Sequence, residues 1–85
     1  MKTLNMSEFV KKNEALFREL NITDRELTII DLLVQGVSNG EISSQLVVTE
    51  STTKRHVYNI FRKLKISNRF ELMKWMNERV VDQLG

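Results

Sequence analysis

Apolar residues recur along this 85-residue chain at steps of three and four, the spacing that places them on one face of an α-helix. One such stripe consists of Leu27, Ile30, Leu33 and Val34. Segments that alternate apolar and polar residues, as half-buried strands do, are few, and the chain has no proline and three glycines. The pattern therefore predicts an all-α fold of several short helices, each of which contributes one apolar stripe to the core.

Residues that favour helix ends divide the first half of the chain. The first predicted helix runs from Ser7, a suitable cap, to Leu20. Thr23 then begins a second helix through a capping box with Glu26, in which each side chain accepts a hydrogen bond from the backbone N–H of the other residue. Gly36 follows the last apolar residue of this helix, where a left-handed cap is expected.

The next segment predicts a short helix, a tight turn and a longer helix. Ser38 and Glu41 form a second potential capping box, and Thr49 caps a helix that continues to about Lys65. The longer helix is expected to bury Thr53, Val57, Ile60 and Leu64. This arrangement is typical of a helix-turn-helix, whose second helix can enter the major groove of DNA.

The side of the longer helix opposite its apolar stripe carries hydrogen-bond donors and cations: Ser51, Lys54, Arg55, Tyr58, Arg62 and Lys65. Residues 51–70 hold six basic side chains and no acidic one, whereas the other 65 residues hold seven basic and eleven acidic side chains. A helix that faces only water usually mixes both signs. Since phosphates bind best where cations gather without neighbouring acids, this charge distribution indicates a DNA-binding face.

Three residues of this helix have alternative explanations. His56 could hydrogen-bond a phosphate or a backbone carbonyl, or it could be purely structural. Tyr58 could read a base, contact the DNA backbone or simply be exposed. Thr53 lies on the apolar face, and we interpret it as a tolerated core residue rather than a DNA contact.

A last helix is predicted from Arg69 to about Asp82, capped by Ser67 or Asn68. Its apolar surface is wider than one stripe and comprises Phe70, Leu72, Met73, Trp75, Met76, Val80, Val81 and Leu84. Either the first helix covers the excess, or the surface is a self-complementary patch between two copies, since aromatic and Met clusters often mark interfaces. We favour the dimer patch.

Composition excludes several kinds of site. With no cysteine and one histidine, the chain can form neither a disulfide framework nor a cysteine-based or histidine-rich metal site. No paired carboxylates, nucleophile motif or glycine-rich phosphate loop indicates an enzyme, and no cofactor is expected. The absence of a signal-peptide pattern and of an apolar run of about 20 residues predicts a soluble, cytoplasmic protein without a membrane partner.

The segments "ITDRELTIIDLLVQGVSNGEIS" and "TESTTKRHVYNIFRKL" resemble the LuxR-type helix-turn-helix family of bacterial response regulators and quorum-sensing regulators. The second segment matches the family pattern at Glu50, Thr52, Lys54, His56, Val57, Asn59, Ile60, Lys63 and Leu64. The resemblance extends over about residues 22–81. It implies a four-helix, winged-helix-like domain without a wing at 22–85, with the helix-turn-helix motif at about 39–58. Residues 1–21 would form an additional N-terminal helix.

The resemblance implies a bacterial transcription regulator that binds specific sequences of double-stranded DNA. Its recognition helix, residues 50–65, would lie in the major groove, and a homodimer formed through the last helix would bind an inverted repeat. Base contacts are implied for Lys54, Arg55 and Tyr58. Contacts with the DNA backbone are implied for Asn39, Thr49, Ser51, Thr52, His56, Asn59, Arg62, Lys63, Lys65 and Arg69. The dimer contact is implied for Leu72, Trp75, Met76 and Arg79. Further potential partners are another transcription regulator and RNA polymerase.

The chain departs from the family pattern at four positions. Gly40 stands where a Lys or Arg often contacts a phosphate, and Lys65 stands where a Gly usually follows the recognition helix. Ser43 replaces a small apolar residue packed between the two helices of the motif, and Thr53 replaces an apolar residue that helps to pin the recognition helix to the core. These differences are expected to weaken packing slightly and to leave the basic face intact.

Residues 1–21 are too few for the receiver or ligand-binding domain that usually precedes this module in the family. We therefore expect regulation to act through protein abundance, a partner or the first helix. An alternative function is a protein-interaction module that retains the fold and inhibits a full-length regulator by heterodimerisation through the last helix. Binding to a random pool of duplexes at low salt distinguishes the two functions.

Overall fold

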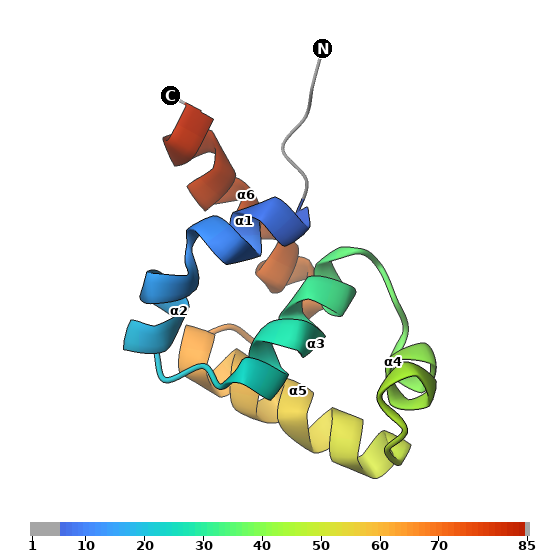
Figure 1. The fold of residues 1–85 in the computed structure, drawn as a ribbon. Helices are drawn as coiled ribbons and strands as arrows, with labels where there is room; N and C mark the ends of the chain where they lie inside the picture. The colour runs from blue at the N-terminus through green and yellow to red at the C-terminus, as the bar shows by residue number, and fades with distance from the viewer. Residues whose placement is uncertain (1–5, 85) are drawn as a thin grey trace.

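The computed structural model describes the backbone of residues 6–84 and, within them, all side chains except those of residues 6, 7, 9 and 80–84. This part of the chain forms six helices and no strand (Figure 1): α1 Met6–Lys12, α2 Glu14–Glu19, α3 Asp24–Val34, α4 Asn39–Leu46, α5 Glu50–Leu64 and α6 Arg69–Leu84. The prediction of an all-α fold is confirmed. None of these helices combines the length and the apolarity that crossing a bilayer requires.

The N-terminal segment, predicted as one helix, forms two. Asn13 separates α1 from α2 with φ −109° and ψ 21°, and its carbonyl accepts a hydrogen bond from the Phe17 N–H at 3.1 Å. Asparagine favours such breaks because its side chain competes for backbone hydrogen bonds. The chain therefore changes direction between Val10 and Phe17, and both side chains are buried in the core. The first helix begins at Met6, before the predicted cap Ser7, whose side chain lies outside the description.

Local hydrogen bonds begin three of the helices where the sequence predicts. The Thr23 hydroxyl accepts from the Glu26 N–H at 3.1 Å, and the Glu26 carboxylate accepts from the Thr23 N–H at 2.9 Å. Ser38 and Thr49 each accept from the backbone N–H three residues further on, at 3.2 Å. The second capping box is incomplete, because the Glu41 carboxylate accepts from the Ser38 hydroxyl at 3.3 Å rather than from its backbone N–H.

Residues in the left-handed conformation end four helices. Gly36 follows α3 with φ 86°, as predicted. Asn21, Val47 and Lys65 follow α2, α4 and α5 with φ between 57° and 65°. The conformation costs a residue with a side chain roughly 1–2 kcal/mol, and more when the side chain is β-branched. Val47 therefore places strain in the turn of the helix-turn-helix, and Lys65 places it at the end of the second helix.

α3 lies at the centre of the molecule, with α1 and α2 on one side and α5 on the other (Figure 1). The buried apolar side chains form one cluster: Val10, Phe17, Ile22, Ile29, Ile30, Leu33, Val34, Ile42, Val57, Ile60, Leu64, Leu72 and Met76. The predicted stripe of α5 is buried as expected. In α3, the predicted core residue Leu27 is only half-buried, and Ile29 is fully buried in addition to the predicted stripe.

The apolar surface of α6 is covered largely from within the chain. Leu72 and Met76 are fully buried, and the Trp75 ring packs against Phe17 of α2 with 5.7 Å between ring centroids. Leu72 and Met76, expected at a dimer contact, therefore lie in the core, because the N-terminal helices and α3 occupy that side of α6. Asn68 caps this helix by accepting from the Glu71 N–H at 2.9 Å. The side chains of residues 80, 81 and 84 lie outside the description.

Candidate nucleic-acid interface

α5 separates an apolar side from a basic side. Thr53, Val57, Ile60 and Leu64 are buried against the rest of the molecule. Six exposed residues, which we call the basic face, lie on the other side: Ser51, Lys54, Arg55, Tyr58, Arg62 and Lys65. α5 runs along the edge of the molecule, away from α1 (Figure 1). The basic face is therefore open to a large partner.

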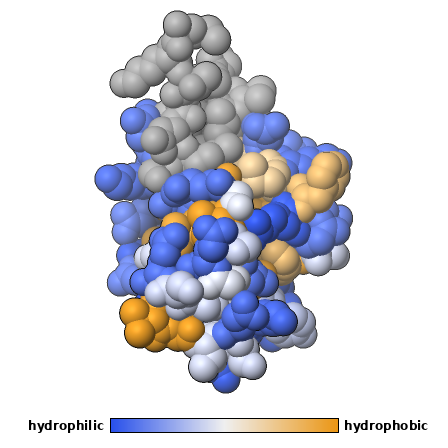
Figure 2. Space-filling view, turned by 90° about the vertical axis from the view of Figure 1, so that its right-hand side faces the viewer, coloured by the Kyte–Doolittle hydropathy of each residue, from blue (hydrophilic) through white to orange (hydrophobic). Residues whose placement is uncertain are grey.

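α4 packs against the N-terminal part of α5 and completes the helix-turn-helix. The turn between them, Val47 and Val48, is held by a hydrogen bond from the Val48 N–H to the Ser43 carbonyl at 3.0 Å. Thr49 then begins α5 as its N-cap. From the side of α4, hydrophilic and near-neutral residues cover most of the surface, and hydrophobic residues form separate groups (Figure 2). This surface is suited to a polar partner.

The predicted backbone contacts at the start of the two helices lie close to helix N-termini. Thr49 and Thr52 place their hydroxyl oxygens 3.0 Å apart at the first turn of α5. Asn39 is the first residue of α4 and is half-buried. Free backbone N–H groups and the helix dipole make such positions favourable for anions. His56 and Asn59 lie further along α5 and are half-buried at the borders of the basic face.

Glu50 is the acidic residue nearest the basic face along α5. Its carboxylate approaches Gly40 of α4, where an added Cβ would lie 2.8 Å from Glu50 Oε1. Glu50 is also the first residue of α5, where the helix dipole favours a negative charge. The missing side chain at Gly40 thus leaves space for a carboxylate beside the α4 N-terminus.

Tyr58 and Arg62 form a pair within the basic face. The Arg62 guanidinium carbon lies 5.8 Å from the centroid of the Tyr58 ring, within the range of a cation–π interaction. Tyr58 is 62% exposed, so the contact leaves most of the ring accessible. Tyr58 and Arg62 are thus neighbours on the exposed side of α5.

Lys63 is not part of the basic face. Its ammonium donates to the Glu26 carboxylate at 2.7 Å and to the Asn21 carbonyl at 2.8 Å, on the side of α5 that meets α3. Burial raises the pKa of Glu26, but hydrogen bonds from Lys63 and the Thr23 N–H, together with the Lys63 charge, hold this pKa below its usual range. The sequence carries a signal for this position, because Lys63 projects beside the buried stripe rather than opposite it.

Arg69 is also engaged within the chain. Its guanidinium donates to the carbonyl of Val37, in the connection between α3 and α4, at 2.7 Å. This bond ties the start of α6 to the segment that leads into the helix-turn-helix. The structure therefore brings together the predicted base contacts and most of the predicted backbone contacts, and it places Lys63 and Arg69 in structural bonds.

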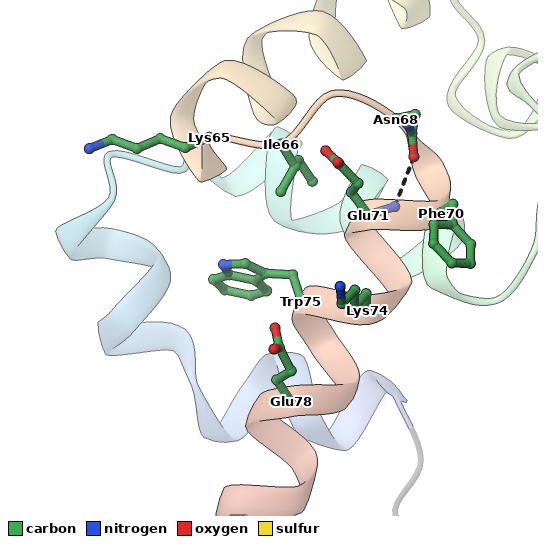
Figure 3. A pocket seen from close by; sticks show the side chains of 8 residues that line it. All are labelled: Lys65, Ile66, Asn68, Phe70, Glu71, Lys74, Trp75 and Glu78. Carbon is green, nitrogen blue, oxygen red and sulfur yellow. Dashed lines mark hydrogen bonds between the residues drawn. The ribbon is translucent and has the colours of Figure 1, made fainter.

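A groove of about 360 Å³ lies along the α5–α6 turn and the first turns of α6 (Figure 3). It is lined by Lys65, Ile66, Asn68, Phe70, Glu71, Lys74, Trp75 and Glu78. Phe70 is 77% exposed, whereas Trp75 is half-buried. Arg79 stacks on the Trp75 ring at 3.8 Å from the centroid and is also half-buried. Of the four predicted dimer contacts, Trp75 and Arg79 thus retain accessible surface.

Comparison with known proteins gives matches that cover the helix-turn-helix. The family model described as "Bacterial regulatory proteins, luxR family" matches residues 20–76. The chain is similar to the CsgBAC operon transcriptional regulatory protein of Escherichia coli, with 39% identity over 59 residues, which are 69% of this chain and 27% of that protein. Over 62 residues it is 39% identical to the nitrate/nitrite response regulator protein NarL of Escherichia coli, covering 72% of this chain and 29% of NarL.

A third relative is the probable transcriptional regulator ycf29 of Guillardia theta, with 30% identity over 73 residues, 86% of this chain and 35% of the relative. The chain thus spans about a third or less of the length of these curated relatives. No solved structure matches the chain significantly.

Proposed function

The chain belongs to the luxR family of bacterial regulatory proteins, and we propose that it regulates transcription by binding particular sequences of double-stranded DNA. The observation that carries this proposal is the basic face of α5, which exposes Lys54, Arg55, Arg62 and Lys65. No acidic residue occurs between positions 51 and 70. Such a surface attracts phosphates strongly, and a helix of this length fits the major groove.

The roles that we propose for these side chains follow from their positions along α5. Recognition helices contact base edges mainly through their N-terminal residues. Lys54 and Arg55, in the second turn, would read bases, with Tyr58 one turn further on. Arg62 and Lys65 would bind phosphates, as would the smaller polar groups at the helix N-termini: Asn39, Thr49, Ser51 and Thr52. His56 and Asn59 would contact the DNA backbone from the borders of the face.

Selection of bound duplexes from a random DNA pool tests this function. The wild-type protein should enrich a shared sequence, and Lys54→Ala/Arg55→Ala should lose the preference for it. Each lost base contact should reduce discrimination by about 10-fold or more. Lys11→Ala/Lys12→Ala removes the same charge from exposed positions of α1 and should retain the preference.

Two results would contradict the proposal. A wild-type protein that binds no duplex at low salt would favour a protein-interaction module that inhibits another regulator. A double variant at Lys54 and Arg55 that keeps the wild-type preference would show that the base-reading residues are assigned wrongly.

For the assembly on DNA, we propose a homodimer that binds an inverted repeat, with a contact through α6. The exposed Phe70 and the accessible part of Trp75 supply apolar surface around the groove of Figure 3. Glu71, Lys74 and Glu78 line the same groove, and opposite charges could pair across a two-fold axis. Leu72 and Met76 take no part, because they are fully buried.

Light scattering of the protein with a selected duplex tests the homodimer. Two copies should bind each full site, and Phe70→Glu should reduce this to one copy on a half-site. Asn77→Asp adds the same charge at an exposed position of α6 and should retain two copies. Unchanged stoichiometry for Phe70→Glu would exclude this contact.

A further inference from the structure

The contact between α4 and α5 contains two buried hydroxyl groups. Ser43 of α4 is 5% exposed, and Thr53 of α5 is fully buried. Ser43 Oγ lies 2.7 Å from Thr53 Oγ1, and it also donates to the Asn39 carbonyl at 2.7 Å. Two positions at which the sequence departs from its family pattern are therefore joined in one interaction.

We propose that Ser43 and Thr53 are a positioning pair whose hydrogen bond fixes the orientation of α5 relative to α4 and thereby sets the sequence preference of the recognition helix. The inference rests on the proposed DNA-binding function. Neither residue touches the DNA. Both act through Lys54 and Arg55, which follow Thr53 directly in the chain.

The geometry of a helix couples Thr53 to these two residues. Successive side chains on an α-helix are turned by about 100°, so Arg55 points nearly opposite to Thr53. Any rotation of α5 about its axis that moves Thr53 away from Ser43 turns Arg55 through the same angle. A restraint on the buried hydroxyl is therefore a restraint on the base-reading side chain.

A hydrogen bond restrains this rotation more than an apolar contact would. Two hydroxyls require a separation near 2.7 Å and a limited range of angles, whereas the attraction between apolar side chains has no preferred direction. Thr53 is fully buried, so water cannot replace the bond once it is broken. Every buried polar side-chain atom among the described residues has a hydrogen-bond partner. Both hydroxyl groups of the pair are therefore satisfied in this arrangement.

Ser43 is hydrogen-bonded to the Asn39 carbonyl as well as to Thr53, so substitutions at the two positions should differ in their effect on stability. Ser43 keeps the Asn39 carbonyl as a partner when Thr53 is changed to Val. Ser43→Ala, by contrast, removes the side chain that is hydrogen-bonded to the Thr53 hydroxyl in the described part of the chain. In urea unfolding, Ser43→Ala should raise the unfolding constant about 10-fold, Thr53→Val should raise it less, and the double variant should recover part of the loss.

Binding measurements separate positioning from stability. Fluorescence anisotropy at fixed salt should compare a duplex selected by the wild-type protein with an unrelated duplex of equal length. Thr53→Val and Ser43→Ala/Thr53→Val should lower the ratio of the two affinities about 5-fold or more, because misplaced base contacts lose discrimination. Affinity for the unrelated duplex should stay unchanged, and Thr53→Ser should keep the wild-type ratio. A folded Thr53→Val variant with the wild-type ratio would overturn the proposal.

A second measurement does not depend on DNA. Residual dipolar couplings of backbone amides in α4 and α5 report the angle between the two helices, and Thr53→Val should change it or broaden its distribution. Identical couplings in wild type and Thr53→Val would overturn the positioning role, whatever the binding result. If the wild-type protein shows no sequence preference, the proposed function fails. The dipolar couplings would still show whether the Ser43–Thr53 hydrogen bond fixes the angle between α4 and α5.

Discussion

Neighbouring residues of the same charge have different roles in this protein, because they lie on different sides of a helix. Arg62 is exposed on the basic face beside Tyr58. Lys63, the next residue, is bonded to Glu26 and to the Asn21 carbonyl. A count of basic residues between positions 51 and 70 treats the two as equal. Of the two, Arg62 is exposed to solvent, whereas the ammonium group of Lys63 is hydrogen-bonded within the chain.

The Glu26–Lys63 pair should make stability depend on pH. Because the pKa of Glu26 is below its ordinary value of 4.5, the unfolded chain binds this proton more readily than the folded one. The Glu26–Lys63 pair therefore contributes its full stabilisation at pH values above 4.5, and this stabilisation is lost as the pH falls through the pKa that Glu26 has in the folded protein. Glu26→Gln should cost about 1–3 kcal/mol at neutral pH and should show a smaller loss of stability on acidification.

Urea unfolding at several pH values between neutral and strongly acidic checks this expectation. Glu19→Gln, at an exposed position of α2, should keep the wild-type pH dependence. An identical pH dependence for Glu26→Gln and the wild-type protein would show that the pair contributes nothing.

The backbone of Lys65 predicts a stabilising change. Lys65 ends α5 with φ 60°, a conformation that costs a residue with a side chain roughly 1–2 kcal/mol and glycine almost nothing. Lys65→Gly should have a free energy of unfolding about 0.5–1 kcal/mol higher than that of Lys65→Ala, and should therefore unfold at a higher urea concentration. This difference allows for the greater flexibility of glycine in the unfolded chain. Both variants lose the positive charge, so the difference between their free energies of unfolding reports the cost of the backbone conformation at position 65. Equal stability would exclude strain at this position.

At the scale of helices, the sequence predicts what depends on local contacts. The capping residues Thr23, Ser38 and Thr49 and the buried stripe of α5 follow from spacing alone, and the structure confirms them. The break at Asn13 was not predicted, because asparagine is tolerated inside helices as well as between them. The hydrogen bond between Ser43 and Thr53 also escaped prediction, since it depends on the packing of one helix against another.

The apolar surface of α6 is a second feature whose partner could not be predicted from local sequence. A wide apolar surface predicts a partner but does not identify it, and Leu72 and Met76 prove to face their own chain. The deciding contact, between Phe17 and Trp75, joins residues 58 positions apart in the sequence. The exposed basic residues were predictable from the α5 pattern. The hydrogen bonds of Lys63 and Arg69 were not, because they also join segments that are distant in the sequence.

The contact of α2 with α6 should be visible in fluorescence, since Trp75 is the single tryptophan of the chain. Phe17→Leu keeps the site apolar but removes the ring contact, and it should cost about 1–2 kcal/mol of stability. The emission of Trp75 in the folded state should shift as its surroundings change. Glu19→Ala, an exposed change on the same helix, should alter neither quantity. An unchanged emission spectrum for Phe17→Leu would contradict this packing.

At the scale of the molecule, the arrangement of helices separates two surfaces. α1 and α2 lie across α3 from α5, so the N-terminal helices cover part of α6 and leave the basic face open (Figure 1). The acidic residues are distributed over the remainder of the chain, outside residues 51–70. The basic face is therefore accessible for the proposed contact with DNA, while the N-terminal helices pack on the opposite side of the molecule.

The salt dependence of DNA binding by Arg62→Ala and Lys63→Ala tests the basic face most directly. Each phosphate contact contributes a slope of about −0.9 to the logarithm of affinity against the logarithm of salt concentration. Arg62→Ala should make the slope shallower by about 1 on every duplex, whereas Lys63→Ala should lower stability and leave the slope unchanged. A wild-type slope for Arg62→Ala, or an equal change for both variants, would contradict the assignment of the exposed side of α5 to DNA.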